Sequence, residues 1–175
     1  MKKTRGTIQV YTGNGKGKTT ASLGLAVRAL GHGQKVCMIQ FMKGSTKYGE
    51  IKFATRTPGL TIIQSGRCCF VSRDNPDPRD VRMARRGLAK AREAVFGGKH
   101  DLVILDEVNV ALDYKLIALD EVLEILRNKP ERVELVLTGR AAPKEIVRLA
   151  DLVSEVKEIK HHWRKGVRAR PGVEF

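Results

Sequence analysis

The stretch Thr12-Gly13-Asn14-Gly15-Lys16-Gly17-Lys18-Thr19-Thr20 decides the fold of this chain. An alternating apolar run at 7–11 precedes it, and an apolar run with helical spacing at 21–30 follows it. A strand, a glycine-rich loop that ends in Gly-Lys-Thr and a helix together form the usual cradle for nucleotide phosphates. Glycines let backbone N–H groups approach an anion, and the helix N-terminus adds the positive end of its dipole. The stretch predicts a nucleotide-binding loop, with an ordinary glycine turn as the minor alternative.

The spacing within this loop is unusual. Lys18 is placed to reach phosphate oxygens, and Thr19 can offer its hydroxyl to Mg²⁺. The usual motif has a glycine five positions before the Gly of Gly-Lys-Thr. Thr12 occupies that position here, the first glycine is Gly13, and an additional lysine, Lys16, lies inside the loop. A tighter cradle can hold a triphosphate differently, so hydrolysis of a γ-phosphate is not assumed.

Composition limits the class of protein. Residues 1–175 are expected to form a single domain with a real core. A hydrophobic content of 42% and a charged content of 30% fit a globular protein. No apolar run approaches the roughly 20 residues of a membrane helix, and the basic start lacks an apolar signal core. We therefore expect a cytoplasmic protein without a membrane partner, whose cysteines, Cys37, Cys68 and Cys69, are reduced spectators rather than a disulfide, redox or metal pair.

The net charge of +14 is large for this length and favours anionic partners such as ATP or nucleic acid. The basic residues are spread along the chain, with clusters at 79–92 and 157–170. No basic stretch is interleaved with aromatic residues in the manner of single-strand binders. A nucleic-acid partner is therefore not expected.

The order of apolar segments predicts an α/β fold. Strands are expected at 7–12, 35–41, 60–64, 101–106, 133–138 and 152–159, and helices at 18–30, 78–96, 116–127 and 143–149. Strands that alternate with helices imply a mainly parallel sheet covered on both faces, which is a three-layer α/β/α arrangement. In such a sheet a ligand binds at the carboxyl ends of the strands, where the phosphate loop begins.

Further polar residues are expected at the same edge. The apolar run 102–105 ends in Asp106 and Glu107, a carboxylate pair that indicates a Mg²⁺ site, with a solvated strand end as the alternative. The two side chains should point to opposite sides of a strand, so one of them is expected to contact the metal. Arg140 follows the fifth strand and either contacts a ligand or lies at the surface. The irregular stretches 43–59 and 66–78 are expected to be loops beside the site, and Phe70 either stacks on a planar ligand or anchors its loop.

A set of segments carries a resemblance to one family. They are Thr12-Gly13-Asn14-Gly15-Lys16-Gly17-Lys18-Thr19-Thr20, Arg28-Ala29-Leu30-Gly31-His32-Gly33, Gln40-Phe41-Met42-Lys43-Gly44, Leu105-Asp106-Glu107, Leu137-Thr138-Gly139-Arg140, Ala150-Asp151-Leu152-Val153-Ser154-Glu155, Lys160-His161, Gly166-Val167-Arg168-Ala169-Arg170 and Gly172-Val173-Glu174-Phe175. From about residue 7 to residue 175 the chain resembles the P-loop type of ATP:cob(I)alamin (corrinoid) adenosyltransferase. The resemblance implies a RecA-like P-loop NTPase fold, a homodimer, and a requirement for Mg²⁺ or Mn²⁺.

The activity implied by the resemblance is transfer of the 5′-deoxyadenosyl group of ATP to the Co(I) of a corrinoid, with release of triphosphate. The family is understood to hold ATP reversed relative to ordinary phosphate-loop enzymes, and the short loop is compatible with that. Lys18 would be the catalytic cation at the leaving group. Thr19 and Glu107 would hold the metal, with Asp106 as support. The ATP-binding residues implied in this way are Gly13, Asn14, Gly15, Lys16, Gly17, Lys18, Thr19, Thr20 and Arg28.

The chain departs from the family pattern at two places. Well-known members have a Gly-Phe-Thr-Trp loop whose aromatic side chains exclude the lower ligand of the corrinoid, so that Co(II) can be reduced by a donor such as a reduced flavoprotein. The corresponding stretch here is Gly66-Arg67-Cys68-Cys69-Phe70, which leaves Phe70 as the expected corrinoid contact. About six residues precede the first strand, where those members have a helical arm that covers the partner's site.

Other classes of nucleotide protein remain open at this point. A RecA-like ATPase would release ADP and phosphate and respond to nucleic acid. A small-molecule kinase would need mobile arginines, for which Arg67, Arg73 and Arg140 are the candidates. A non-catalytic nucleotide-binding module is the weakest alternative, because the loop lysine and the carboxylates are both present. The identity of the product distinguishes all of them.

Overall fold

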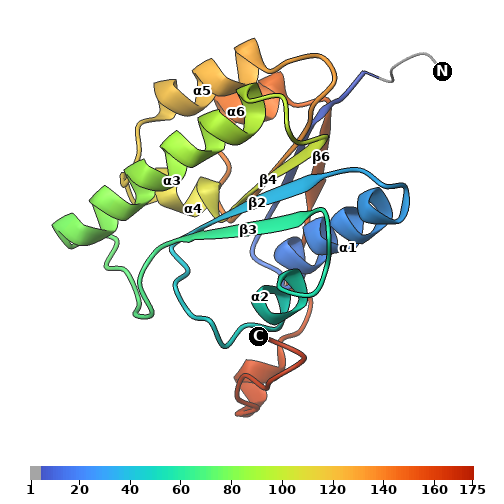
Figure 1. Ribbon diagram of the computed structural model, residues 1–175. Helices are drawn as coiled ribbons and strands as arrows, with labels where there is room; N and C mark the ends of the chain where they lie inside the picture. Colours follow the sequence, from blue (N-terminus) through green and yellow to red (C-terminus); the bar gives the residue numbers. More distant parts are fainter. Residues whose placement is uncertain (1–4) are drawn as a thin grey trace.

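The computed structural model describes residues 5–175, which form one sheet of six parallel strands with helices on both faces (Figure 1). The strands lie in the order β3-β2-β4-β5-β1-β6, and every pair of neighbours is parallel. The elements, in chain order, are β1 (Ile8–Thr12), α1 (Lys18–Gly31), β2 (Val36–Phe41), α2 (Gly49–Ala54), β3 (Leu60–Ser65), α3 (Pro78–Phe96), β4 (Leu102–Asp106), α4 (Val108–Asp113), α5 (Leu119–Asn128), β5 (Glu134–Thr138), α6 (Lys144–Leu149), β6 (Leu152–Glu155) and the 3₁₀ helix η1 (His162–Lys165).

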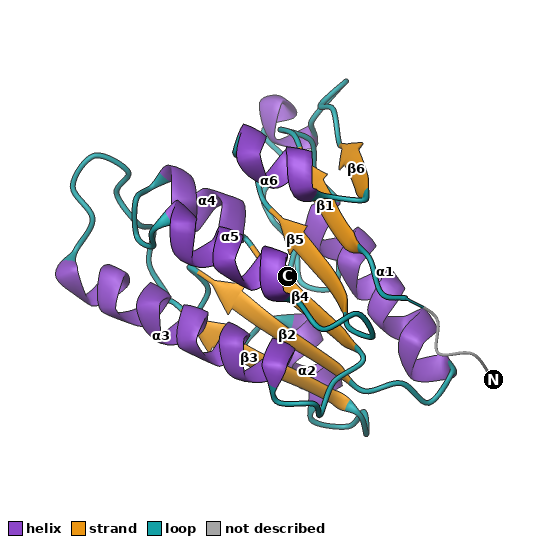
Figure 2. Ribbon diagram, turned by 90° about the horizontal axis from the view of Figure 1, so that it is seen from above, coloured by secondary structure: helices purple, strands orange, loops and turns teal. Residues whose placement is uncertain are grey.

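Helices lie on both faces of the sheet, as Figure 2 shows from above, and an apolar layer fills the space between the sheet and the helices on each face. The larger layer lies between the sheet and α3, α4, α5 and α6, and the smaller one lies between the sheet and α1 with α2. The strands β2 and β4 are buried along their whole length, as expected for central parallel strands covered on both faces. The predicted three-layer α/β/α fold is confirmed.

The strand order brings the loop and the carboxylates together. β5 lies between β1, which leads into the loop, and β4, which ends at Asp106. In register, Tyr11 of β1 is opposite Thr138 of β5, and Ile104 of β4 is opposite Val136. The carboxyl ends of the three strands therefore meet at one edge, where α/β proteins of this kind bind their ligands.

Most elements match the sequence expectations, including the short helix α6 near the predicted 143–149, and the main exceptions are two short helices and the end of the last strand. The stretch 43–59, expected to be irregular, contains α2, and a further short helix, α4, follows β4 directly. Both helices have six residues, too few for a repeating apolar face to show in the sequence. The last strand ends at Glu155 rather than at 159, because the backbone of Val156 turns toward the phosphate loop.

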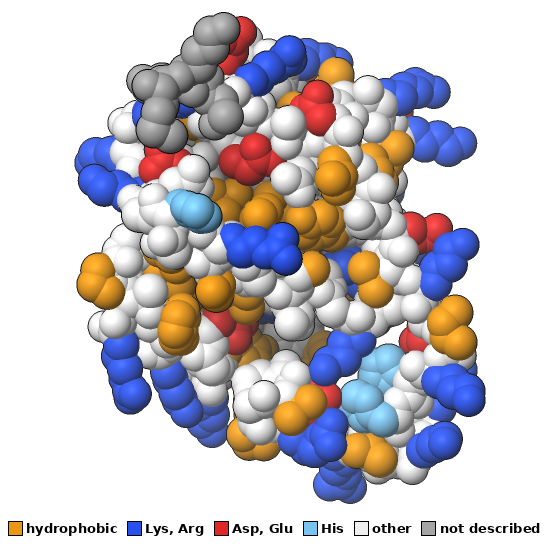
Figure 3. Space-filling view, turned by 90° about the vertical axis from the view of Figure 1, so that its right-hand side faces the viewer, with side chains coloured by type: hydrophobic (Ala, Val, Ile, Leu, Met, Phe, Trp, Pro, Cys, Tyr) orange, Lys and Arg blue, Asp and Glu red, His pale blue; other side chains and the backbone are white. Residues whose placement is uncertain are grey.

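Side chains of Lys and Arg lie around much of the outline of the face seen in Figure 3, which is hollowed in its lower half. The basic charge is thus distributed over this face rather than concentrated in one patch. No helix within residues 5–175 is both long enough and apolar enough to span a membrane.

Candidate active site

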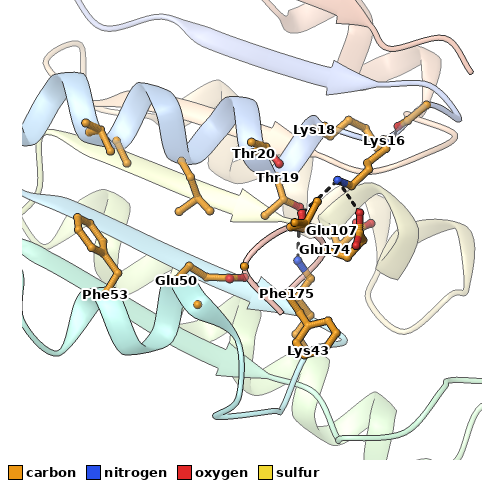
Figure 4. Close-up of a pocket in the computed structure, with 18 of the residues that line it drawn as sticks. Lys16, Lys18, Thr19, Thr20, Lys43, Glu50, Phe53, Glu107, Glu174 and Phe175 are labelled. Carbon is orange, nitrogen blue, oxygen red and sulfur yellow. Dashed lines mark hydrogen bonds and ion pairs between the residues drawn. The ribbon is translucent and has the colours of Figure 1, made fainter. Parts of the chain in front are cut away.

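A cavity of about 620 Å³ opens at the carboxyl edge of the sheet. Its polar end is formed by loop residues 14–20 with Lys43, Glu107 and Arg140, and its other end by apolar side chains of α1 and α2. Residues 172–175 form a further wall. Figure 4 shows that Lys16, Thr19, Lys43, Glu107 and Glu174 converge at the polar end.

Backbone geometry explains the glycines of the loop. Gly13 and Gly17 have φ values of 94° and 122°, in the left-handed region that favours glycine. A Cβ on Gly13 would lie 2.5 Å from the carbonyl oxygen of Val156, and one on Gly15 would lie 2.7 Å from that of Lys157. The Gly15 N–H donates a hydrogen bond to the carbonyl oxygen of Val156 at 2.7 Å. The loop is thus pinned against residues 156–157, which follow the edge strand β6.

Lys18 lies folded across this loop. Its ammonium donates to the carbonyl oxygens of Gly13 and Gly15, both at 2.7 Å. Burial lowers the pKa of Lys18, while the nearby charge of Glu107 acts in the opposite direction. The side chain is 7% exposed and lines the cavity. Lys18 is therefore a fixed cation at the polar end of the cavity. It is held by carbonyl oxygens of the same loop that is predicted to bind phosphate.

Asp106 is the centre of the hydrogen bonds beneath the loop. One carboxylate oxygen accepts from the hydroxyls of Thr19 and Thr138, both at 2.8 Å. The other oxygen accepts from the ammonium of Lys43 at 2.7 Å. Asp106 is fully buried, so these three donors take the place of water around its charge. Asp106 thereby links the first turn of α1 to the ends of β4 and β5.

Glu107 faces the cavity directly. Its φ of 61° places it in the left-handed conformation just after β4, where it caps the short helix α4. Burial raises the pKa of Glu107, and the charge of Asp106 raises it further, while Lys43, Lys18 and Arg140 lower it. The expected separation of the two carboxylates is present, but its cause is this backbone turn rather than the alternation of a strand.

Lys43 lies between these groups although no sequence motif assigns it a role. Its ammonium is 2.7 Å from Asp106 and 3.4 Å from the Thr19 hydroxyl. Burial acts to lower the pKa of Lys43, but the charge and the hydrogen bond of Asp106 outweigh burial and raise it. Met42, just before it, has a φ of 60°, an uncommon conformation that directs the chain out of β2 at this point.

This set of donors suits a divalent cation bound together with phosphates. The Thr19 hydroxyl and the Glu107 carboxylate face the cavity, and the Lys43 ammonium marks a position between Thr19 and Asp106 where positive charge is stabilised. Within residues 5–175, no group of three or more His, Cys, Asp or Glu side chains comes together as a metal cluster. One carboxylate and one hydroxyl at the cavity wall are the number of protein ligands that Mg²⁺ takes when phosphates and water complete its shell.

The structure brings most of the predicted nucleotide residues together, with exceptions. Residues 14–20 and Glu107 line the cavity, whereas Gly13 and the fully buried Asp106 are not among the lining residues. Arg28 is exposed on α1 outside the cavity, so its placement gives no support for a contact with a nucleotide there. Phe70 is fully exposed on the loop between β3 and α3, away from the cavity lining.

The arginines suggested for a kinase lid are in different situations. Arg67 makes a two-point ion pair with Asp80, with both contacts at 2.6 Å, and Arg73 pairs with Asp113 at 2.7 Å. Arg140 does line the cavity. Two of the three candidates are therefore tied to the protein itself, which weakens the kinase alternative.

Comparison with known proteins agrees with this geometry. Residues 4–175 match the family model described as ATP:corrinoid adenosyltransferase BtuR/CobO/CobP. A corrinoid adenosyltransferase of Sinorhizobium sp is 38% identical over 98% of this chain and 81% of its own length. The corrinoid adenosyltransferase of Escherichia coli K12 is 35% identical over 98% of this chain and 86% of its own length.

A solved structure supports the fold independently. The KaiC-like protein PH0186 of Pyrococcus horikoshii OT3 superposes with a TM-score of 0.53 over 89% of this chain and 75% of its own. At 15% identity this likeness concerns the fold alone, and it agrees with the RecA-like arrangement expected from the sequence. With the family model matched over nearly the whole sequence and relatives above 30% identity at near-complete coverage, the chain belongs to the ATP:corrinoid adenosyltransferase family.

Proposed function

We propose that this chain transfers the 5′-deoxyadenosyl group of ATP to the Co(I) of a corrinoid at the cavity between its phosphate loop and Glu107. The observation that carries the proposal is the meeting of loop residues 14–20 with Glu107 and Arg140 in one cavity. The family is that of corrinoid adenosyltransferases, and the match covers the residues that form this cavity. Cobalamin and cobinamide-type precursors are both within the proposed substrate class.

The step needs no general base. The electron pair of Co(I) forms the cobalt–carbon bond to C5′ of the ribose, the C5′–O bond breaks, and triphosphate leaves with the electron pair of the broken C5′–O bond. Charge therefore develops on the phosphate oxygen nearest the reacting carbon. Catalysis then rests on holding the two substrates in line and on stabilising the leaving group by fixed positive charge.

In our proposal, different residues of the cavity bind the triphosphate and the metal. Lys18 neutralises oxygens of the leaving triphosphate, and the backbone of Asn14 to Thr20 positions it, with Arg140 and Lys16 adding positive charge. Thr19 and Glu107 hold Mg²⁺ or Mn²⁺ with Asp106 as support, and the metal, when bound, offsets negative charge on the triphosphate. The position of Lys43 between Thr19 and Asp106 supports a cation site at this point.

The proposal extends to partners. A homodimer is proposed from the family, and the edge strand β6 supports it because Leu152 and Val153 are each more than 40% exposed. A reduced flavoprotein is proposed as the electron donor and the cytoplasm as the compartment. The free state of Cys37, Cys68 and Cys69 is compatible with a reducing compartment.

The decisive experiment is an anaerobic reaction of the protein with ATP, Mg²⁺ and chemically reduced cob(I)alamin. We expect the visible spectrum to show a light-sensitive adenosylcobalamin, with an equal amount of triphosphate released. Omission of Mg²⁺, with Mn²⁺ added back, tests the metal requirement. Release of ADP and phosphate without a cobalt–carbon product would overturn the proposal in favour of an ATPase.

A further inference from the structure

Residues 172–175, here called the strap, reach the phosphate loop from the far end of the sequence. The ammonium of Lys16 donates to the carbonyl oxygen of Val173 at 3.1 Å and pairs with the carboxylate of Glu174 at 3.2 Å. Figure 4 shows Lys16 and Glu174 directed toward each other at the polar end of the cavity. These are the contacts that the structure gives to the side chain of Lys16, the additional lysine of the unusually short loop.

Glu174 is itself held in place. Its carboxylate accepts from the backbone N–H of Arg170 at 2.9 Å and from the Arg170 guanidinium at 3.2 Å, and it lies 3.5 Å from His162. The side chain is 12% exposed, and the hydrogen bonds from Arg170, with a smaller contribution from Lys16, lower the pKa of Glu174 to about 2 although burial acts in the opposite direction. Glu174 is therefore a fixed anion across the pH range in which enzymes of this kind operate.

The strap also closes the cavity next to α2. The rings of Phe175 and Tyr48 meet edge to face, with centroids 6.4 Å apart. Tyr48 is the residue that precedes α2, whose Glu50 and Phe53 line the cavity. The strap thus joins two parts of the cavity wall that are far apart in the sequence, the phosphate loop and α2.

The charges in this cluster do not cancel. Lys16 and Arg170 carry two permanent positive charges, and Glu174 offsets one of them. The region next to the loop therefore remains attractive to a polyanion, while Lys16 is kept from the many rotamers of a free lysine. A lysine held in advance loses less conformational freedom when a phosphate arrives.

We propose that the strap is a nucleotide-binding element in which Glu174 positions Lys16 for the triphosphate and Phe175 closes the cavity wall against Tyr48. This proposal rests on the proposed function only in that ATP is taken as the occupant of the cavity. Glu174 is a positioning residue, since it acts through Lys16. The opposite effect, in which Glu174 competes with phosphate for Lys16, would show itself as tighter ATP binding when the carboxylate is removed.

The test measures the Kd for ATP with Mg²⁺ by calorimetry, without corrinoid, for the wild-type protein and for Glu174→Gln. We expect Glu174→Gln to weaken binding by roughly three- to tenfold, the order of one charge-assisted contact made less favourable. Glu124→Gln is the matched control, because Glu124 pairs with Arg92 at 2.6 Å between α5 and α3 and lies outside the cavity lining. It should bind ATP as the wild type does.

A double-mutant cycle separates positioning from a general effect on structure. Lys16→Ala alone should weaken ATP binding, and Lys16→Ala with Glu174→Gln should weaken it no further, because Glu174 acts through Lys16. Phe175→Ala should give a separate, additive loss. Far-UV circular dichroism and thermal melting of each variant establish that the fold is retained.

Several results would overturn the proposal that the strap binds the nucleotide. They are unchanged or tighter ATP binding in Glu174→Gln, equal losses in Glu174→Gln and Glu124→Gln, additive losses in the double mutant, and a wild-type protein that does not bind ATP. The proposed function is judged separately, by adenosylcobalamin formation in the wild-type protein. If the protein makes adenosylcobalamin but binds ATP equally well with and without the Glu174 carboxylate, the proposed function stands and the proposed role of the strap is wrong.

Discussion

Lys18 is a buried cation that lines the polar end of the cavity. In Lys18→Ala, the carbonyl oxygens of Gly13 and Gly15 lose their donor, and charge that develops on the leaving triphosphate loses a fixed cation. We expect adenosyl transfer to fall by at least about a hundredfold, in line with the loss of a preorganised charge-stabilising donor. Rates from single-turnover reactions with cob(I)alamin measure this effect apart from binding.

The control for this change is Lys144→Ala, an exposed lysine on α6 at a distance from the cavity lining. It should leave the rate unchanged. If Lys18→Ala loses only affinity for the corrinoid while the rate on bound substrates stays intact, Lys18 does not have the role assigned to it.

Lys43 tests whether the buried carboxylate beneath the loop needs a cation. Lys43→Met keeps an unbranched apolar side chain but removes the terminal ammonium that pairs with Asp106 at 2.7 Å. Asp106 is fully buried, so we expect the free energy of unfolding to fall by about 2 kcal/mol. Added Mg²⁺ should recover part of the loss without any nucleotide, because the ion can occupy the vacated position.

Thermal melting with and without Mg²⁺ measures this prediction for Lys43→Met, for the wild type and for the exposed Lys47→Met. The wild type and Lys47→Met should respond little to the ion in the absence of nucleotide. A Lys43→Met protein as stable as the wild type, or one indifferent to Mg²⁺, would show that Lys43 does not hold the place of a cation.

At the scale of elements, the predictability of the chain follows the length of its pattern. α3 and the buried strands repeat an apolar face or run often enough to be recognised, and the loop between β1 and α1 has its own glycine signature. The helices α2 and α4 and the 3₁₀ helix η1 have no more than six residues each, and tertiary contacts decide them. In the cavity wall, α2 belongs to this second class, since its stretch was expected beside the site only as a loop. The strap, which the sequence left without a role, is likewise held by contacts distant in sequence.

Lys43 and Glu174 show why the rest of the site could not be predicted. Both lie in segments that match the family, yet their roles depend on contacts with residues far along the chain, Asp106 for Lys43 and Lys16 for Glu174. No local pattern encodes such a pairing. By contrast, Lys18, Thr19 and Glu107 follow directly from a loop and a strand end that the sequence displays.

Gly87 tests the packing of α3 on the sheet. A Cβ at this position would lie 2.5 Å from the Oγ of Ser65 and 2.7 Å from its Cβ, at the carboxyl end of β3. Ser65 is buried and its hydroxyl donates to the carbonyl oxygen of Met83, so it has little room to move. Gly87→Ala should therefore destabilise the protein by about 1–3 kcal/mol, although alanine is the better helix former.

Gly24→Ala is the matched control, because Gly24 lies inside α1 and a Cβ there meets nothing within 4 Å. It should be neutral or stabilise the protein by up to about 1 kcal/mol. Urea denaturation of both variants measures the difference. A Gly87→Ala protein that is as stable as Gly24→Ala would mean that α3 can shift away from β3 at little cost.

On the scale of the whole molecule, the two substrates must meet although their predicted contacts lie on different elements. The nucleotide cavity is bounded by α1, α2, Glu107 and the strap, whereas Phe70 projects from the loop between β3 and α3. The two sites are nevertheless at neighbouring strand ends. The loop with Phe70 follows β3, and β3 pairs with β2, whose carboxyl end leads to Lys43 in the cavity wall. A corrinoid that contacts Phe70 and reaches the nucleotide has to extend over this end of the sheet.

Phe70→Ala tests this arrangement. Phe70 is fully exposed, so its removal should change stability by less than about 0.5 kcal/mol, and any effect on turnover is an effect on the substrate. As the proposed wedge that excludes the lower ligand, it matters when Co(II) has to be reduced on the protein. We expect about a tenfold or larger fall in turnover when cob(II)alamin and a reduced flavoprotein are supplied, and a near-normal rate with chemically reduced cob(I)alamin.

Unchanged turnover of cob(II)alamin, with the cob(I)alamin control also normal, would remove Phe70 from the corrinoid site. Equal losses in both assays would make Phe70 a general corrinoid contact rather than a wedge.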